Sequence, residues 1–264
     1  MSKLRPLLFI AALLAGVFTH AATIVLEGNY QGKNLFVQNP YSEAGVGFCI
    51  YQVTVNDKVA TDEINSSAFE VDLGNFNLKM GEKVVIKIMH KDGCTPKVLN
   101  PEVLKPKSTF DIVKQSVASD GTYTWTTVNE SGQLPFVVQQ KRWNKWVRAG
   151  EVMGDGSPGN HTYTFKVVPH SGENTFRVKQ TDLTNRSRFS ENTLYNAAGM
   201  PAVTWTYDKS KGSINFSSST MYEVYDQFGN IVKRGFATQV DVKDLKKGLY
   251  YVNYDSKMGE SFKK

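Results

Sequence analysis

The chain has 264 residues, of which 41% are hydrophobic, 12% aromatic and 21% charged, and its formal net charge is +6. This composition excludes collagen-like, low-complexity disordered and multi-span membrane proteins. Two cysteines are too few for a disulfide-dense small scaffold. The length fits one large domain or two to three small ones.

The first twenty-one residues have the pattern of a secretory signal peptide. Lys3 and Arg5 give a positive start, an apolar run follows from Leu7 to Phe18, and Ala21 supplies a small residue for cleavage. A membrane anchor is the alternative, but a span needs about 20 apolar residues. Removal of residues 1–21 leaves 243 residues with a formal charge of +4, which is too small an excess of basic residues to indicate nucleic-acid binding. We therefore expect no transmembrane segment and no nucleic-acid partner for the mature chain.

The mature chain reads as strands almost throughout. Alternating runs rich in β-branched and aromatic residues, such as Val84–Ile88 and Thr162–Val167, are separated by turn pairs such as Gly229-Asn230. No stretch of twelve residues after the signal peptide has a convincing helical period. The sequence predicts an all-β chain of three small Ig/fibronectin-like β-sandwich domains in tandem, at residues 22–118, 119–196 and 202–264.

The first domain, residues 22–118, carries both cysteines. Cys49 lies in a strand pattern and Cys94 follows the turn pair Asp92-Gly93. Export to an oxidising compartment predicts a disulfide between them, and closing this loop of 45 residues stabilises the domain by about 4 kcal/mol in the chain-entropy model. A metal site from His90, Asp92, Cys94 and Cys49 is the alternative, but metal-ligand spacing is lacking. We expect no metal and no cofactor.

Motifs that carry catalysis are missing from the sequence. None of the histidines lies in an HExxH motif, and there is no Gly-x-Ser-x-Gly elbow. The segment Gly154–Ser157 is rich in glycine, but the Lys-Ser/Thr of a phosphate-binding loop does not follow, so we interpret it as a turn between strands. A Ser-His-Asp set stays open as an alternative, because any exported domain contains these residue types, although nothing in the sequence places them together. Our prediction is that the protein is not an enzyme.

Two tryptophans three residues apart make the most unusual local cluster. Trp143 and Trp146 alternate with bases in Lys141–Trp146. One hypothesis is an exposed aromatic platform for a glycan, with anionic glycan or lipid headgroups as the charged variants. The other is that one indole is in the core while the second covers a turn.

The second block resembles a known module over residues 131–195. The order of Phe136–Gln140, Gly150–Ser157, Tyr163–Phe165 and Gly172–Asp182 is similar to the fibronectin-III-like sandwich that often precedes the C-terminal signal of type IX secretion cargo. The resemblance implies a β-sandwich.

The third block resembles the type A sorting domain of the same secretion system. Its marks are the hairpin Tyr222–Val232, the segment Val240–Val252 and the basic end Phe262–Lys264, while the Pro-Asn-Pro opening of that family is absent at Ala198–Pro201. The resemblance implies a turn at Gly248 and core anchors at Leu245 and Tyr250. The residues it marks for sorting or interaction are Asp226, Gly229, Leu245, Gly248, Tyr250, Lys263 and Lys264.

These resemblances lead to two hypotheses about function. The favoured one is an exported non-enzymatic protein of the type IX secretion and gliding machinery, whose retained residues 202–264 contact a translocon, shuttle or sensor. The alternative is type IX cargo, a cell-surface adhesin or glycan-binding protein that uses the third block only as an address. Either places the protein in the periplasm, outer membrane or cell surface of a gram-negative bacterium.

Overall fold

The computed structural model describes residues 22–43 and 46–264, so the expected signal peptide at residues 1–21 lies outside the described residues. The described chain consists mainly of β-strands and confirms the all-β prediction. None of its described helices is long and apolar enough to cross a membrane. The chain divides into two compact units, one holding most of residues 22–101 and the other holding all of 102–264 with two short segments, 28–33 and 77–84.

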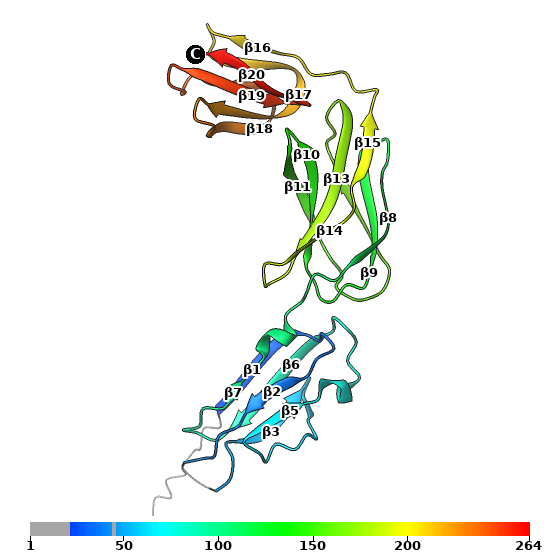
Figure 1. The fold of residues 1–264 in the computed structure, drawn as a ribbon, viewed down its shortest axis with the longest axis vertical. Helices are drawn as coiled ribbons and strands as arrows, with labels where there is room; N and C mark the ends of the chain where they lie inside the picture. Colours follow the sequence, from blue (N-terminus) through cyan, green and yellow to red (C-terminus); the bar gives the residue numbers. More distant parts are fainter. Residues whose placement is uncertain (1–21, 44–45) are drawn as a thin grey trace, which may run out of the picture. The chain divides into compact units, whose positions relative to one another are not determined.

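The first unit is a two-sheet sandwich, drawn in blue to cyan in Figure 1. One sheet has the order β1-β6-β3-β4 and the other the order β5-β2-β7. Strand β6 shows how the sequence forms them, because Val84, Ile86 and Ile88 alternate with more exposed residues and face the core. The elements are β1 (Ala22–Asn29), β2 (Leu35–Gln38), β3 (Ile50–Val55), β4 (Lys58–Val59), β5 (Ala68–Val71), η1 (Leu73–Phe76), β6 (Lys83–His90), β7 (Lys97–Val98) and η2 (Pro101–Leu104).

The predicted disulfide is present in this sandwich. Cys49, directly before β3, is bonded to Cys94, which follows β6, the neighbour of β3 in the sheet. Cys49 is buried, and its carbonyl accepts a hydrogen bond from the Lys91 backbone at 3.0 Å. Because both sulfur atoms are used in the bond, neither is available as the thiolate ligand that the alternative metal site required.

The second sandwich begins earlier than the sequence predicted. Strand β8 (Asp111–Val117) pairs with β9 (Thr122–Val128), and Phe110 lies in the core of this sandwich. The expected boundary at residue 118 therefore differs from the structure, in which the Pro-containing segment around η2 separates the sandwiches. The remaining strands are β10 (Pro135–Arg142), β11 (Lys145–Met153), β12 (His161–Lys166), β13 (Gly172–Thr181), β14 (Ser187–Phe189) and β15 (Thr193–Ala197).

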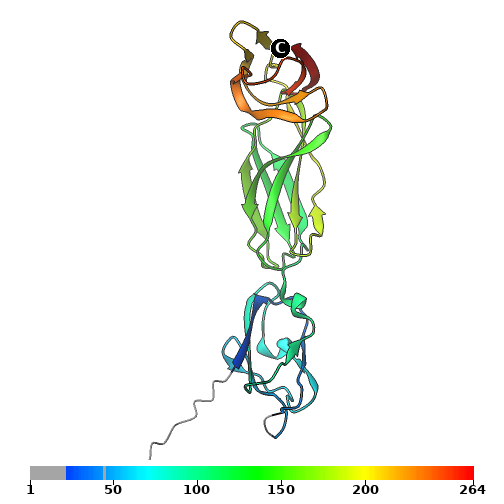
Figure 2. The ribbon, with the colours of Figure 1, turned by 90° about the vertical axis from the view of Figure 1, so that its left-hand side faces the viewer.

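Strand order identifies the second sandwich as fibronectin-III-like. One sheet has the order β12-β9-β8, and the other the order β11-β10-β13, with β14 and β15 both paired to β13. Named A to G along the chain, this is a three-stranded E-B-A sheet facing a C′-C-F-G sheet, and its strands run lengthwise beside one another in Figure 2. Trp125, Phe136 and Phe176 are fully buried between the two sheets.

The third sandwich contains β16 (Trp205–Asp208), β17 (Ser213–Asp226), β18 (Ile231–Asp241), β19 (Leu249–Tyr254) and β20 (Lys257–Lys263). Its strand order is β16-β17-β19-β20, and β18 also pairs with β17. The long β17 pairs with β16 near its start and with β19 near its end, and its pairing with β18 is irregular between Asn215 and Thr220. The core includes Ile214, Val224 and Val252, each with no exposed surface.

Candidate functional site

The residues that the sequence marks for sorting lie at one end of the third sandwich. Asp226 ends β17, and its partner across the sheet is Tyr250 near the start of β19. Lys263 ends β20 and is paired with Leu249. The structure thus brings the end of β17, the start of β19 and the end of β20 together at the same end of the sheet.

Asp226 and Gly229 build the hairpin between β17 and β18. The Asp226 carboxylate accepts hydrogen bonds from the backbone N–H groups of Phe228 and Asn230, both at 2.9 Å, and from the Asn230 side chain at 3.0 Å. The bond from the Asn230 side chain is the largest of the effects that lower the pKa of Asp226. Gly229 has a φ of 83°, a conformation that glycine adopts without strain. These two residues therefore shape the turn.

Tyr250 and Leu245 belong to the core, while Gly248 closes the loop before β19. Tyr250 is buried and stacks on Phe262 with ring centroids 5.5 Å apart, and its hydroxyl donates to the Lys246 carbonyl at 2.9 Å. Leu245 is partly buried against the same cluster. The backbone of Gly248 exchanges hydrogen bonds with that of Lys264, at 3.3 and 3.0 Å. Its φ is not positive, so the turn here does not depend on left-handed backbone.

The ammonium group of Lys264 binds the loop between β18 and β19. It donates hydrogen bonds to the carbonyls of Val242, Lys243 and Leu245. These carbonyls belong to the loop that follows β18, where the strand ladder has ended. The Val242 carbonyl also accepts a hydrogen bond from the Leu245 backbone at 3.2 Å, and the lysine supplies a further donor to it and a donor to the other two. The side chain of Lys263 points outward and is exposed.

A pocket lined by lysines opens beside this loop. Its lining combines the turn between β16 and β17, the loop after β18 and the last residue of the sequence. Two of these lysines have an acid nearby, since Lys211–Asp208 and Lys243–Asp241 are each 3.8 Å apart. Asp244, in the loop after β18, is paired with Lys233 at 2.8 Å. We call this the lysine-lined pocket; its lysines are Lys209, Lys211, Lys243, Lys247 and Lys264, and no acid lines it.

The opposite end of β19 and β20 is packed into the second sandwich. Asp255, in the turn between these strands, is 2% exposed. Its carboxylate accepts hydrogen bonds from the Ser171 backbone at 3.0 Å, from the Ser171 hydroxyl and from the Val203 backbone at 3.4 Å. Arg142, 3% exposed, donates from Nη1 to the Asp255 carbonyl at 3.2 Å. We call this contact the junction.

Burial shifts the ionisation of the charged groups at the junction. It lowers the pKa of Arg142 to about 10, although Asp255 opposes the shift. Burial alone would raise the pKa of Asp255. The hydrogen bonds that its carboxylate accepts from Ser171 and Val203 outweigh this effect, so the pKa of Asp255 lies below its usual value. Burial, with Arg142 nearby, lowers the pKa of His170. The junction therefore favours a neutral histidine beside an ionised aspartate.

The hairpin of β10 and β11 contributes a second contact to the junction, and it separates the two tryptophans. Lys145 donates to Glu223 at 2.6 Å and to the Tyr225 hydroxyl at 2.9 Å. Trp143, in the hairpin turn, is only 9% exposed. Trp146 lies on the outer face of the sheet, where it stacks on Arg177. The structure therefore does not bring Trp143 and Trp146 into one exposed platform.

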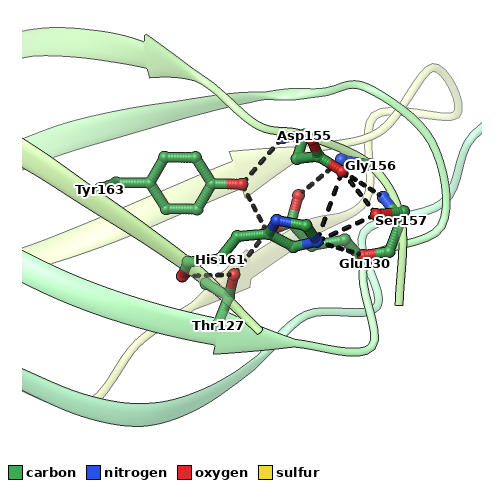
Figure 3. Close-up of polar contacts among 7 residues, drawn as sticks. All are labelled: Thr127, Glu130, Asp155, Gly156, Ser157, His161 and Tyr163. Atoms are coloured by element: carbon green, nitrogen blue, oxygen red, sulfur yellow. Dashed lines mark hydrogen bonds and ion pairs between the residues drawn. The ribbon is translucent and has the colours of Figure 1, made fainter. Parts of the chain in front are cut away.

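A cluster of polar side chains lies at the start of β12 (Figure 3). Glu130 is 1% exposed, and its carboxylate accepts hydrogen bonds from Thr127, from Tyr163 at 2.8 Å and from the Gly156 backbone at 2.9 Å. Burial is the main cause that raises the pKa of Tyr163. The glycine-rich turn is the only part of this cluster that the sequence analysis singled out, because Thr127 on β9 and Glu130 in the following loop are far from that turn in the sequence.

Asp155, Ser157 and His161 meet in the same cluster, but not as a catalytic triad. Ser157 Oγ lies 2.5 Å from Asp155 Oδ1, to which it donates, and 3.0 Å from His161 Nε2. The distance from Asp155 Oδ1 to the same Nε2 atom is 3.3 Å. A triad needs the aspartate on one ring nitrogen and the serine on the other. Because both partners lie at Nε2, these contacts hold the turn at Asp155–Ser157 against β12 and do not activate the serine.

Comparison with known protein families identifies a match within the third sandwich. Residues 208–264 match the family described as a secretion system C-terminal sorting domain. This match confirms the resemblance to type IX secretion proteins and marks the chain as exported toward the outer membrane or cell surface. No curated protein matches the chain.

Solved structures of other proteins show only a distant likeness. A tetra-tandem repeat from the extending region of a large adhesion protein covers 93% of this chain and 72% of its own, with 12% identity and a TM-score of 0.31. A biofilm-associated protein BSP domain covers 91% and 62%, with 11% identity and a TM-score of 0.24. The chicken CNTN1 FN1–FN3 domains cover 91% and 96%, with 12% identity and a TM-score of 0.27.

Proposed function

We propose that this exported protein is not an enzyme and acts through protein–protein contacts of its sorting domain. The carrying observation is the lysine-lined pocket, in which three separate segments place five lysines around one depression. Such a concentration of one charge attracts an oppositely charged surface and speeds encounter with it. The partner is an acidic surface on the type IX secretion apparatus: a translocon, shuttle or sensor.

The opposite placement of pocket and junction supports a sorting domain that is retained. Strands β19 and β20 run between the two, so a partner can occupy the pocket while Asp255 stays buried against Ser171. Release of the domain by cleavage near residue 200 would require the junction contacts to break. Val203, close to that position, is only 6% exposed, and its backbone donates a hydrogen bond to Asp255. A retained domain suits a component or regulator of the apparatus better than cargo with a removable address.

Charge reversal in the pocket tests the proposed contact. The double variant Lys209→Glu with Lys247→Glu removes two exposed lysines that form no ion pair in the described chain. We expect export, measured by cell fractionation and immunoblotting, to fall at least about tenfold while the protein stays folded. Lys114→Glu, on β8 of the second sandwich, is the matched control and leaves export unchanged. Normal export of the double variant would refute the role of the pocket.

The fate of the C-terminal segment tests retention. Intact-mass spectrometry of the exported protein is expected to include Lys264. A mature terminus near residue 200 would contradict retention and favour cargo.

The second candidate is cargo that binds a glycan at the cell surface. A solvent-facing cluster of aromatic and cationic side chains on the second sandwich favours it. This candidate predicts removal of residues 202–264 and normal localisation of the remaining two sandwiches.

A further inference from the structure

The outer face of the second sandwich carries a cluster that neither the junction nor the core uses. Along β10 and β13 alternate residues point inward, with Val138 and Val178 buried, so the residues between them point outward. Trp146 on β11, Arg177 on β13 and Phe189 on β14 meet on this outer side. We call these three residues the stacked-arginine face.

The guanidinium group of Arg177 lies against two aromatic rings. Its central carbon is 3.9 Å from the ring centre of Trp146 and 4.2 Å from that of Phe189. Each contact is a cation–π interaction, which holds the flat group in place. Phe189 keeps 45% of its surface exposed, so the assembly stands open to solvent.

Most hydrogen-bond donors of this arginine remain available. Nε donates to Gln139 Oε1 at 2.9 Å. The four N–H groups on the two terminal nitrogens have no acceptor among the described residues. A guanidinium edge of this kind matches a carboxylate with two parallel hydrogen bonds. Because stacking has already fixed the side chain, binding loses less conformational entropy.

The surrounding charge favours an anion. Lys141, paired across the sheet with Trp146, and Lys179, whose ammonium is 5.9 Å from the Phe189 ring centre, form no ion pair in the described chain. Of the acids on this face, Glu151 is engaged by Arg148 at 2.8 Å. The other, Glu173, lies beyond the residues of β13 that pair with β10.

We propose that the stacked-arginine face binds an acidic polysaccharide, with a uronate carboxylate on the edge of Arg177 and sugar rings against Trp146 and Phe189. Flat, partly apolar sugar rings match exposed aromatic rings beside a cation. A peptide added as a strand would use the backbone edge of β11 or β14, the strands at the two ends of this sheet, whereas the stacked-arginine face offers side chains on the flat face of the sheet. The site is separate from the lysine-lined pocket, which belongs to the third sandwich.

Binding of a defined oligosaccharide by the full mature chain tests the proposal. The probe is tetragalacturonic acid in isothermal titration calorimetry at low salt, compared with its fully methyl-esterified form, which has the same rings without charge. We expect the acid to bind and the ester to bind at least about tenfold more weakly. Arg177→Gln should weaken binding of the acid about tenfold, the value of one charge-assisted contact. Trp146→Ala should weaken it about as much, because it removes a ring that meets the sugar and that holds Arg177 in place. Lys114→Gln, on the other sheet, should leave it unchanged.

Several results would overturn the proposal. Equal binding of acid and ester, no binding of the acid at millimolar concentration, or an unchanged affinity of Arg177→Gln would each do so. Equal or tighter binding of a tetraglutamate peptide would replace the polysaccharide by an acidic protein segment. If Arg177→Gln does not fold, Arg177→Lys keeps the charge and removes the planar fork, and it too should bind the acid more weakly.

Discussion

The two compact units of this protein are held by different means. The first contains a covalent bond between Cys49 and Cys94. The second joins two sandwiches at the junction, where Asp255 and Arg142 are almost completely buried. A disulfide acts mainly by restricting the unfolded chain, whereas buried charges act in the folded state.

This difference has consequences for how each unit responds to change. The covalent bond responds to reductant, while the junction responds to pH and to the loss of any single hydrogen-bond partner. All four tryptophans lie in residues 102–264, so tryptophan fluorescence follows the second unit alone. Far-UV circular dichroism follows both units, and the pair of methods separates them.

Loss of the disulfide should have the largest effect. We expect Cys49→Ala with Cys94→Ala to lower the free energy of unfolding of the first unit by about 4 kcal/mol, because the unfolded chain regains the freedom of the closed loop. Circular dichroism should show an earlier melting step, while the tryptophan transition stays in place. Reduction of the wild-type protein should reproduce the result, and an equal shift of the tryptophan signal would contradict it.

Asp255→Ala should weaken the second unit by about 3 kcal/mol. It leaves the two donors of Ser171 and the Val203 N–H without their acceptor at a buried site. Urea titration followed by tryptophan fluorescence measures the loss. Asp226→Ala, which removes a turn carboxylate at the exposed end of the same domain, is the control and should cost less. An equal loss from both would mean that burial at the junction has no special weight.

Acid should weaken the second unit in two stages. His170 has a lowered pKa in the folded protein, so below the usual value of about 6.5 the unfolded state takes up more protons and stability falls. Asp255 also has a lowered pKa, so its contribution is present above about 3.9 and is lost as the pH falls further. The tryptophan-monitored melting temperature should drop by a few degrees between pH 7 and pH 5. His170→Gln should flatten this part of the profile, and an unchanged slope would exclude the histidine as its source.

An exposed ion pair should have the smallest effect. Lys87 and Asp57 lie 2.6 Å apart in the first unit, but Asp57 keeps 81% of its side chain exposed. Lys87→Ala should change stability by less than about 1 kcal/mol, because solvent screens the pair. Lys145→Ala, which frees the nearly buried Glu223 at the junction, should cost more by chemical denaturation. The reverse order would contradict the contrast between exposed and buried pairs.

Local signals in the sequence accounted for much of the fold. Alternation in segments such as Val84–Ile88 predicted strands, and the turn pair Gly229-Asn230 predicted the hairpin after Asp226. The start of the second sandwich was missed because β8 is mostly exposed and carries only a weak apolar alternation. The prolines around Pro101 and Pro106 mark the connection more accurately than the end of β8.

The candidate sites were harder to predict. Sequence motifs marked Lys264 and Tyr250, but not the pocket, because Lys209 and Lys247 come from separate turns. Asp255 looks like an ordinary hairpin aspartate, and its partner Ser171 is 84 residues away. Nothing near Arg177 in the sequence indicates that Trp146 and Phe189 will hold it.

The sequence by itself determined the all-β class, the disulfide and the sorting-domain resemblance, because these depend on local alternation, turn residues and the number of cysteines. The tertiary structure alone decided which charges are buried at the junction and which are gathered in the lysine-lined pocket. It also separated Trp143 from Trp146 and placed Arg177 between aromatic rings. Burial and charge clustering depend on which distant strands become neighbours, and a periodic pattern within one strand does not encode its neighbours.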